Sequence, residues 1–419
     1  MSRSTRKLNG IAFLVLILPY VASADAIRLP LKMGPVADYG ATPWYTTGLT
    51  MGISPMQFAL DTGTNLFWAT VDTCNTTACQ AHQRISTSQP DFEFIADPNY
   101  PKKVGFGPWG SMEVNLGQVP VHVSSATISD ARFDASIDYD GEKFQYLNWG
   151  GGVGLPSESA SVSPDINNVF LSLYGSGALP SLVFSFYTDA SSGQGNAILG
   201  GDDPSQYDSS TLIQLPPKKS PSPDLIYLWG TEVFHVLVGS TEIEVLENGI
   251  FYLDSGSSRF KGEREYIEPI LNELLNYKDN EGNPIFEKYS DDPETEFTGI
   301  KYANGKSPQD FPGILPDFSV TIGNTCNAEP GSSAKISLSP EQFSYEVEVG
   351  DRQGEWVAAF HVLDGVDGLL VGSTFMDLMY TKFEFDIQSD QSLTQGTMAL
   401  YKKTSGTQPA GYECVSSSF

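Results

Sequence analysis

The sequence predicts a mostly β protein that is built from two related halves and contains only a few short helices. Short runs of β-branched and aromatic residues, bounded by Gly, Pro, Asn and Asp, recur along the chain, a pattern typical of strands joined by turns. A seven-residue segment that begins with apolar residues and ends in Asp-Thr/Ser-Gly-Thr/Ser occurs at residues 58–64 and again at residues 251–257. Because two copies in one context are unexpected from ordinary composition, the repeat indicates an internal duplication.

The individual elements follow from residue periodicity. We expect strands over five β-rich runs, at residues 56–60, 112–123, 182–187, 233–238 and 343–349. Residues 265–277 are predicted to be helical because five apolar residues recur there at helical spacing, namely Ile267, Ile270, Leu271, Leu274 and Leu275. Residues 216–223, which read Pro-Pro-Lys-Lys-Ser-Pro-Ser-Pro, have the composition of a loop.

The N-terminal segment has the features of a secretory signal peptide. Arg3, Arg6 and Lys7 precede an apolar run at residues 11–18, and the small residues Ala22-Ser23-Ala24 follow it. The apolar run is shorter than the roughly 20 residues that cross a bilayer, so no membrane anchor is predicted. We therefore expect a secreted monomer with a signal peptide at residues 1–24, an N-terminal lobe at 25–205 and a C-terminal lobe at 206–419.

The strongest compositional signal is the excess of acidic residues. The chain has 51 Asp and Glu against 24 Lys and Arg, which gives a formal net charge of −27. Loss of the three cations in the leader would make this about −30. Nucleic-acid binding is not expected, because phosphate recognition requires a basic surface. The sequence pI of about 4.3 suits an acidic environment, where much of the self-repulsion disappears.

The four cysteines, in an exported chain without a Cys-x-x-Cys pair, favour disulfides over metal ligation. Cys74 and Cys79 can close a small loop, and Cys326 and Cys414 are then left for each other. We expect these two pairs, although sequence alone allows three pairings. The triplet Asn75-Thr76-Thr77 lies inside the small loop and is a glycosylation acceptor on a eukaryotic secretory route.

The two copies of the repeated segment carry the candidate chemistry. In each, an apolar strand ends at Asp, at position 61 or 254, and turns through Gly63 or Gly256, where freedom at positive φ would permit a tight reversal. The hydroxyls that flank each Gly have two expected roles. Thr62 and Ser255 can bond across to the partner loop, and Thr64 and Ser257 can donate to the carboxylates. The alternative is that each Asp only opens an Asx-type turn.

These motifs resemble those of the pepsin-like aspartic proteases, in which two β-rich lobes each contribute one Asp to a shared cleft. The resemblance spans residues 44–390 and is carried by further segments, namely Trp44-Tyr45-Thr46-Thr47-Gly48-Leu49, Leu66-Phe67-Trp68, the pair Cys74 and Cys79, residues 195–201 and residues 370–376. It implies a bilobal pepsin-like acid protease fold, with the active cleft between two pseudo-symmetric lobes.

The resemblance also implies the chemistry. Asp61 and Asp254 would be the catalytic pair, held so close that they share one proton. One carboxylate would act as general base on water, and its protonated partner would polarise the scissile carbonyl. Neither a metal nor a cofactor is needed, and the four scattered histidines, His82, His122, His235 and His361, are expected to be structural. The implied partners are protein or peptide substrates, cut between bulky apolar residues at acidic pH.

The chain departs from the family pattern at two places. The family's flap carries a Tyr that bonds toward the Trp matched by Trp68, but residues 104–112 contain no Tyr. Either Phe106 is the equivalent residue or Trp109 replaces it with an indole N–H donor. The segment between Ala24 and Trp44 is too short for the family's basic pro-domain. Either the enzyme is made without one and is held inactive by pH alone, or residues 25–36 form the first strand, which we expect. The rival function is a pepsin-fold binding or inhibitor protein with reduced or no proteolytic activity.

Overall fold

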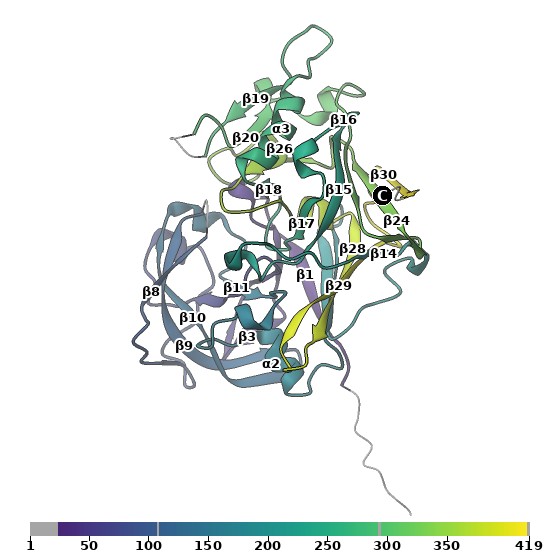
Figure 1. Ribbon diagram of the computed structural model, residues 1–419. Coiled ribbons are helices and arrows are strands. Elements are labelled where there is room, and N and C mark those ends of the chain that lie inside the picture. Colours follow the sequence, from purple (N-terminus) through teal and green to yellow (C-terminus); the bar gives the residue numbers. More distant parts are fainter. Residues whose placement is uncertain (1–23, 107–108, 292–294, 417–419) are drawn as a thin grey trace, which may run out of the picture.

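The computed structural model describes residues 24–106, 109–291 and 295–416. The expected signal peptide at residues 1–24 lies outside the described residues, apart from Ala24. The predicted mostly-β architecture is confirmed: strands form two large sheets, and the helices are few and short. In Figure 1 the first half of the chain, in purple and blue, occupies the lower body, and much of the second half, in green, occupies the upper body.

The first half of the chain supplies most strands of the larger sheet, which has 18 strands. Its principal strands are β5 (Phe58–Asp61), β6 (Phe67–Thr70), β8 (Lys102–Gly105), β9 (Ser111–Val123), β10 (Ala126–Asp140) and β11 (Gly151–Gly154). The shorter elements are β2 (Trp44–Thr46), β3 (Leu49–Met51), β4 (Ser54–Pro55), β7 (Glu93–Phe94), α1 (Thr77–Gln80) and α2 (Val169–Gly175). β11 runs parallel to β5 and antiparallel to β6, so it closes the sheet behind the first Asp.

The second half forms a sheet of 12 strands that repeats this arrangement. Its strands are β15 (Gly230–Val238), β16 (Thr241–Glu242), β17 (Gly249–Leu253), β18 (Phe260–Gly262), β19 (Phe286–Tyr289), β20 (Gly299–Tyr302), β21 (Phe318–Ile322), β24 (Ser332–Leu338), β25 (Ser344–Glu346), β26 (Trp356–Val362), β27 (Leu369–Val371) and β30 (Gly411–Ser416). β27 runs parallel to β17 and antiparallel to β18. In both halves the strand that leads to the Asp therefore has a parallel neighbour, which in turn pairs antiparallel with the strand that follows the Asp loop. This shared arrangement explains the repeated sequence pattern.

Strands from both ends of the chain join the two halves. β1 (Ile27–Met33) pairs with β13 (Gln194–Leu199), and β12 (Val183–Asp189) pairs with both β13 and β28 (Met379–Ile387). The remaining members of this region are β14 (Ile213–Leu215), β22 (Thr325–Cys326), β23 (Glu329–Pro330) and β29 (Leu393–Lys402). Figure 1 shows the yellow hairpin of β28 and β29 beside the teal β14. The expectation that residues 25–36 contain the first strand is confirmed by β1.

The helix and strand predictions hold, with differences at the ends. The predicted helix is α3 (Arg264–Leu275), and its buried stripe includes Ile267, Ile270, Leu271 and Leu274. The last helix, α4 (Ser373–Met376), follows β27. The strand expected at 343–349 is only β25, because Val347 bonds to Glu355 across a turn and Val349 bridges to Ala37 instead. Residues 216–222 form the predicted loop.

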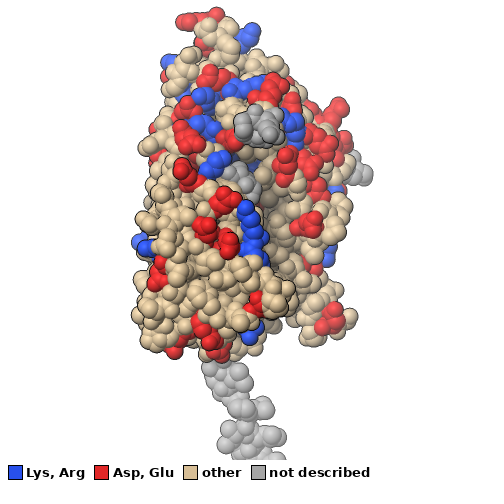
Figure 2. Space-filling view, turned by 90° about the vertical axis from the view of Figure 1, so that its left-hand side faces the viewer, with Lys and Arg blue, Asp and Glu red and all other residues tan. Residues whose placement is uncertain are grey.

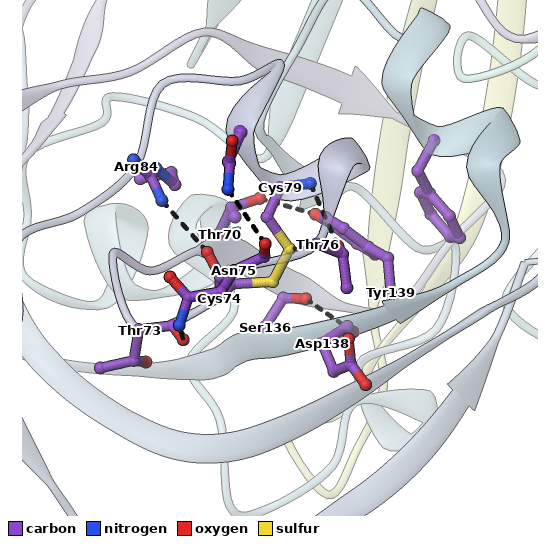
Figure 3. The surroundings of a disulfide bond; sticks show 12 residues. Thr70, Thr73, Cys74, Asn75, Thr76, Cys79, Arg84, Ser136, Asp138 and Tyr139 are labelled. Atoms are coloured by element: carbon purple, nitrogen blue, oxygen red, sulfur yellow. Dashed lines mark hydrogen bonds between the residues drawn. A yellow bond between two sulfur atoms is a disulfide. The ribbon is translucent and has the colours of Figure 1, made fainter.

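The structure contains both predicted disulfides, Cys74–Cys79 and Cys326–Cys414. The second links β22 of the larger sheet to β30 of the smaller one, so it ties the C-terminal strand to both sheets. Figure 3 shows the first, where the Arg84 guanidinium donates to the Cys74 carbonyl at 3.1 Å. Asn75 is exposed on this loop, as a glycosylation acceptor must be.

The surface carries the acidic excess expected from the composition. Figure 2 shows Asp and Glu side chains over much of one face, with Lys and Arg side chains among them. Among the described residues, no helix has both the length and the apolar character needed to span a membrane.

A buried carboxyl group, that of Asp377, lies just after α4. Its Oδ2 accepts the Trp44 indole N–H at 3.0 Å, and its Oδ1 accepts the Thr188 hydroxyl at 2.5 Å. The Lys403 ammonium donates to the main-chain carbonyls of Asp377 and Thr188, at 2.6 and 2.8 Å. Burial raises the pKa of Asp377 from 3.8 to about 6, so this carboxyl prefers to be protonated in the folded state.

The buried Asp377 carboxyl is therefore expected to make the folded protein more stable at acidic pH than at neutral pH. A carboxyl whose pKa is raised on folding contributes stability that is complete below pH 3.8 and is lost as the pH rises through about 6. We expect Asp377→Asn to raise the free energy of unfolding at pH 7 by about 3 kcal/mol and to change it little at pH 3.5. Urea unfolding at both pH values measures this, with the exposed Asp130→Asn as control. An equal effect of Asp377→Asn at the two pH values would contradict the assignment.

Candidate active site

Hydrogen bonds of two hydroxyl groups join the loops that follow β5 and β17. The Ser255 Oγ accepts the Thr62 amide N–H at 3.0 Å and donates to the Leu60 carbonyl at 2.6 Å. In the mirror arrangement, the Thr62 Oγ1 accepts the Ser255 N–H at 2.9 Å and donates to the Leu253 carbonyl at 2.8 Å. Both hydroxyls therefore bond across to the partner loop, as predicted, and fix the two strand ends against each other.

These bonds place the carboxyl groups of Asp61 and Asp254 next to each other in one cleft. Each also accepts an amide from its own loop, Asp61 from Gly63 at 2.8 Å and Asp254 from Gly256 at 2.9 Å. The pKa of Asp61 is raised well above its ordinary value, first by burial and then by the negative charge of Asp254. Two carboxyl groups so placed cannot both ionise readily, so the pair holds one proton.

The two glycines are required for a reason other than the one predicted. Neither Gly63 nor Gly256 has a positive φ, so left-handed backbone is not what the loops need. A Cβ at Gly63 would lie 2.3 Å from the Asp254 Oδ1, and a Cβ at Gly256 would lie 2.2 Å from the Asp61 Cγ. Each Gly thus leaves room for the carboxyl group of the opposite loop.

The second hydroxyl of each motif breaks the symmetry. The Ser257 Oγ donates to the Asp254 Oδ2 at 2.5 Å, as predicted. Thr64 differs from the prediction, because its Oγ1 accepts the Leu66 N–H at 3.3 Å and the described residues contain no Thr64–Asp61 hydrogen bond. Asp254 therefore has one more hydrogen-bond donor than Asp61.

The dyad opens into a cleft of about 210 Å³. Besides the dyad loops, the polar groups of its wall include the Lys261 ammonium and the Tyr227 phenol. The pKa of Tyr227 is raised to about 12, first by burial and then by the charges of Asp254 and Asp61. The apolar part of the wall comes from both halves of the chain and includes Leu66, Leu225, Leu363, Val366 and Leu370. Such a cleft suits an extended, mostly apolar ligand.

The hairpin of β8 and β9 covers this cleft. Its Phe106 ring packs edge-on against Trp68, with centroids 5.5 Å apart. The Trp109 indole N–H donates to the Tyr39 carbonyl at 3.3 Å, and its ring packs against Trp149 at 6.2 Å. Residues 107–108 lie outside the described residues. The two candidate flap residues thus have different roles. Phe106 packs against Trp68, and Trp109 bonds the hairpin to the segment at Tyr39.

The first disulfide belongs to the buried cluster on which the hairpin of β8 and β9 packs. Cys74 and Cys79 belong to the buried cluster that includes Trp68 and Tyr139. The Tyr139 hydroxyl shares a hydrogen bond of 2.6 Å with the Thr70 Oγ1, and Figure 3 shows both side chains beside the disulfide. The disulfide loop therefore stabilises the cluster that Phe106 and Trp109 of the hairpin contact.

Sequence reasoning did not predict Lys261 or Tyr227 in the cleft. A signal for Lys261 was present in the duplication, since Lys261 follows Asp254 by the same seven positions by which Trp68 follows Asp61. The first copy has a Trp at this position and the second copy has a Lys. Comparison of the two copies can therefore detect Lys261 as a departure. Tyr227 lies outside both copies and carried no such signal.

The histidines are not part of the site. His361 is buried, and its pKa is lowered well below the ordinary value, first by burial and then by the charge of Arg259. Within the described ranges, no group of three or more His, Cys, Asp or Glu residues is arranged to hold a metal ion.

Comparison with known proteins identifies the family. The sequence model described as "Eukaryotic aspartyl protease" matches residues 44–392. The chain belongs to the eukaryotic aspartyl protease family. Its resemblance to pepsin-like proteases is therefore established over most of its length, and the two Asp residues with their surrounding loops lie inside the matched region.

Individual relatives are distant. The chain is 25% identical over 289 residues to Pepsin A-5 of Mus musculus, covering 68% of this chain and 66% of the relative. It is 24% identical to Pepsin B of Canis lupus familiaris, covering 63% and 65%, and 23% identical to Vacuolar protease A of Neurospora crassa, covering 51% and 52%. The chain thus spans between about half and slightly less than two thirds of the length of these relatives.

Proposed function

We propose that this chain is an aspartic endopeptidase that hydrolyses peptide bonds with Asp61 and Asp254. The observation that supports it best is the contact between the two carboxyl groups, held by the reciprocal bonds of Thr62 and Ser255. A water molecule between the carboxyl groups loses a proton to the ionised Asp. The water oxygen attacks the scissile carbonyl carbon while the protonated Asp gives its proton to the carbonyl oxygen, which forms the tetrahedral intermediate. The C–N bond then breaks, the proton taken from water passes to the leaving amine, and one hydroxyl of the intermediate returns its proton to the other Asp.

The cleft supports a proposed preference for extended peptides with bulky apolar side chains. The substrate would lie as an added strand beneath the hairpin of β8 and β9, with its side chains against Phe106, Leu363, Val366 and Leu370. Closure of the hairpin would exclude water from the reacting bond.

The setting of the enzyme is part of the same proposal. We infer a secreted monomer with a signal peptide at residues 1–24, an N-terminal lobe at 25–205 that carries Asp61, and a C-terminal lobe at 206–419 that carries Asp254. Two disulfides suit an oxidising compartment. The raised pKa values of Asp61 and Asp377 favour activity and stability at acidic pH.

A binding or inhibitor protein of the same fold is the second candidate. The observation that favours it is the hairpin, which lacks a Tyr between β8 and β9 and uses the Trp109 N–H to anchor itself at Tyr39. Such a protein would retain the dyad as a ligand site without efficient turnover.

A digest of an unfolded protein at several acidic pH values, with and without a statine-type transition-state mimic, separates the two candidates. The endopeptidase cleaves the substrate, and the mimic blocks cleavage. A chain that binds the mimic but cleaves nothing is a binding protein, and one that does neither contradicts both candidates.

The hairpin residues are expected to affect different kinetic constants. Trp109→Phe keeps an aromatic ring but removes the bond to the Tyr39 carbonyl, worth about 1 kcal/mol. We expect it to lower kcat about fivefold, because the hairpin is held less firmly over the dyad. Phe106→Leu reduces the cover over the substrate and is expected to raise KM instead. Steady-state kinetics measures both, with the exposed Phe94→Leu as control. If neither substitution changes the kinetics of the active parent, the hairpin is not the flap.

A further inference from the structure

Lys261 is a buried lysine in the wall of the cleft, on β18, and only 3% of its surface is exposed. Its Nζ donates to the Ser257 Oγ at 2.9 Å, and that hydroxyl donates to the Asp254 Oδ2 at 2.5 Å. The side-chain stem lies against Gly40, and the ammonium lies near the Trp109 ring. A Cβ at Gly40 would lie 3.0 Å from the Lys261 Cε, and the Nζ lies 5.5 Å from the centroid of the Trp109 ring.

Among the residues that the structure describes, the first half of the site has no equivalent of this chain of bonds. The position that corresponds to Lys261 is the buried Trp68, and Thr64 binds the Leu66 N–H instead of a carboxylate. Lys261 therefore bonds toward Asp254 through Ser257, and its charge acts on both carboxyl groups, more on Asp254 than on Asp61. Because the Ser257 Oγ accepts from the ammonium, its own proton is directed to the Asp254 oxygen.

We propose that Lys261 is a positioning residue for the reaction: acting through Ser257, it holds Asp254 as the ionised member of the dyad and places the shared proton on Asp61. In this arrangement Asp254 is the base that activates water, and Asp61 is the acid that polarises the substrate carbonyl. A cation also favours the ionised form of nearby carboxyl groups, so Lys261 moves the pH range of hydrolysis toward acid. This inference rests on the proposed protease function.

The electrostatic surroundings support this division of roles. Burial lowers the pKa of Lys261 to about 8, so the ammonium is charged throughout the acidic range. The pKa of Asp61 is raised, first by burial and then by the charge of Asp254, while the charge of Lys261 lowers it. The titratable or charged groups that act on Lys261 or on the dyad from neighbouring elements are Tyr227, Arg259 and His361. His361 is kept neutral by burial and by the charge of Arg259, and Arg259 is paired with Asp38.

The test compares the pH dependence of kcat/KM in the parent and in two neutral variants. Lys261→Met removes both the charge and the donor, and Lys261→Gln removes the charge but keeps an N–H donor. We expect both limbs of the profile to move to higher pH by about one unit in both variants, with about a tenfold loss on the acidic limb. The control is Lys306→Met, which makes the same charge change at an exposed lysine that belongs neither to the cleft nor to the hairpin of β8 and β9. Its profile is expected to match the parent.

Other outcomes overturn the inference. If kcat/KM falls by the same factor at every pH in the Lys261 variants, Lys261 is only structural. If the pH profile shifts in Lys261→Met but not in Lys261→Gln, the hydrogen bond to Ser257 controls the dyad and the charge does not. A loss confined to peptides with Asp or Glu makes Lys261 a substrate subsite instead.

A second readout keeps the inference testable if the parent cleaves nothing and the proposed function fails. The carboxyl ¹³C signals of Asp61 and Asp254 can be titrated in the parent and in Lys261→Met. Midpoints of the coupled pair that rise in the variant support the inference, and unchanged midpoints overturn it.

Discussion

Asp61→Asn and Asp254→Asn are each expected to abolish hydrolysis of peptide bonds, with a loss of about 10³-fold or more in kcat. The reaction requires one ionised carboxylate and one protonated carboxyl group. An amide supplies neither the base nor the transferable proton. Because Asn keeps an oxygen that accepts the N–H of Gly63 or Gly256, the loops are expected to retain their geometry.

The same substitutions are expected to leave the protein folded and slightly more stable. Each replaces one of two crowded carboxyl groups by a neutral group, and this removes their mutual repulsion near neutral pH. The matched control is Asp140→Asn, at an exposed carboxylate on β10 that pairs with Lys103, and its kcat should equal that of the parent. Residual activity of more than a few per cent in a purified, folded Asp254→Asn variant would show that the dyad assignment is wrong.

Arg259→Met is expected to lower the free energy of unfolding by about 3–5 kcal/mol. Arg259 is fully buried beside the dyad loop. Its guanidinium bonds the Tyr289 hydroxyl at 3.0 Å, the His361 Nδ1 at 3.1 Å and the Asp38 Oδ1 at 3.4 Å, and it also bonds the Tyr345 hydroxyl. Removal of this one partner leaves the other buried polar groups without their shared donor.

The effect of Arg259→Met is expected to reach the flap as well. Asp38 opens the segment whose Tyr39 carbonyl accepts the Trp109 N–H, so a looser Asp38 weakens the anchor of the hairpin. Chemical denaturation measures the stability, and kcat of the folded variant measures the second effect. The control is Arg132→Met, which removes one long hydrogen bond between exposed side chains, to the Gln118 Oε1 at 3.4 Å, and should change stability by less than about 0.5 kcal/mol. Equal stability of the two variants would mean that Arg352, which also binds Asp38 at 2.6 Å, suffices alone.

The sequence by itself determined the features that depend on local pattern or on the duplication. The alternating runs predicted the strands, the spacing of Ile267, Ile270 and Leu274 predicted α3, and the repeated motif predicted both the two-part fold and the meeting of Asp61 with Asp254. These predictions held because neighbours on one face of a helix or strand are set by their spacing along the chain.

Only the tertiary structure decided what surrounds these residues. Gly63 and Gly256 are needed for the close approach of the opposite carboxyl group, which no local rule for turns contains. Lys261 reaches Asp254 through Ser257 because β18 lies beside the dyad loop, and Arg259 meets Asp38 across 221 positions of sequence. The environment of a strand residue depends on which distant strands pair beside it. Hence the burial of these charges and their effect on the dyad follow from the packing of the two sheets and not from the pattern of the chain.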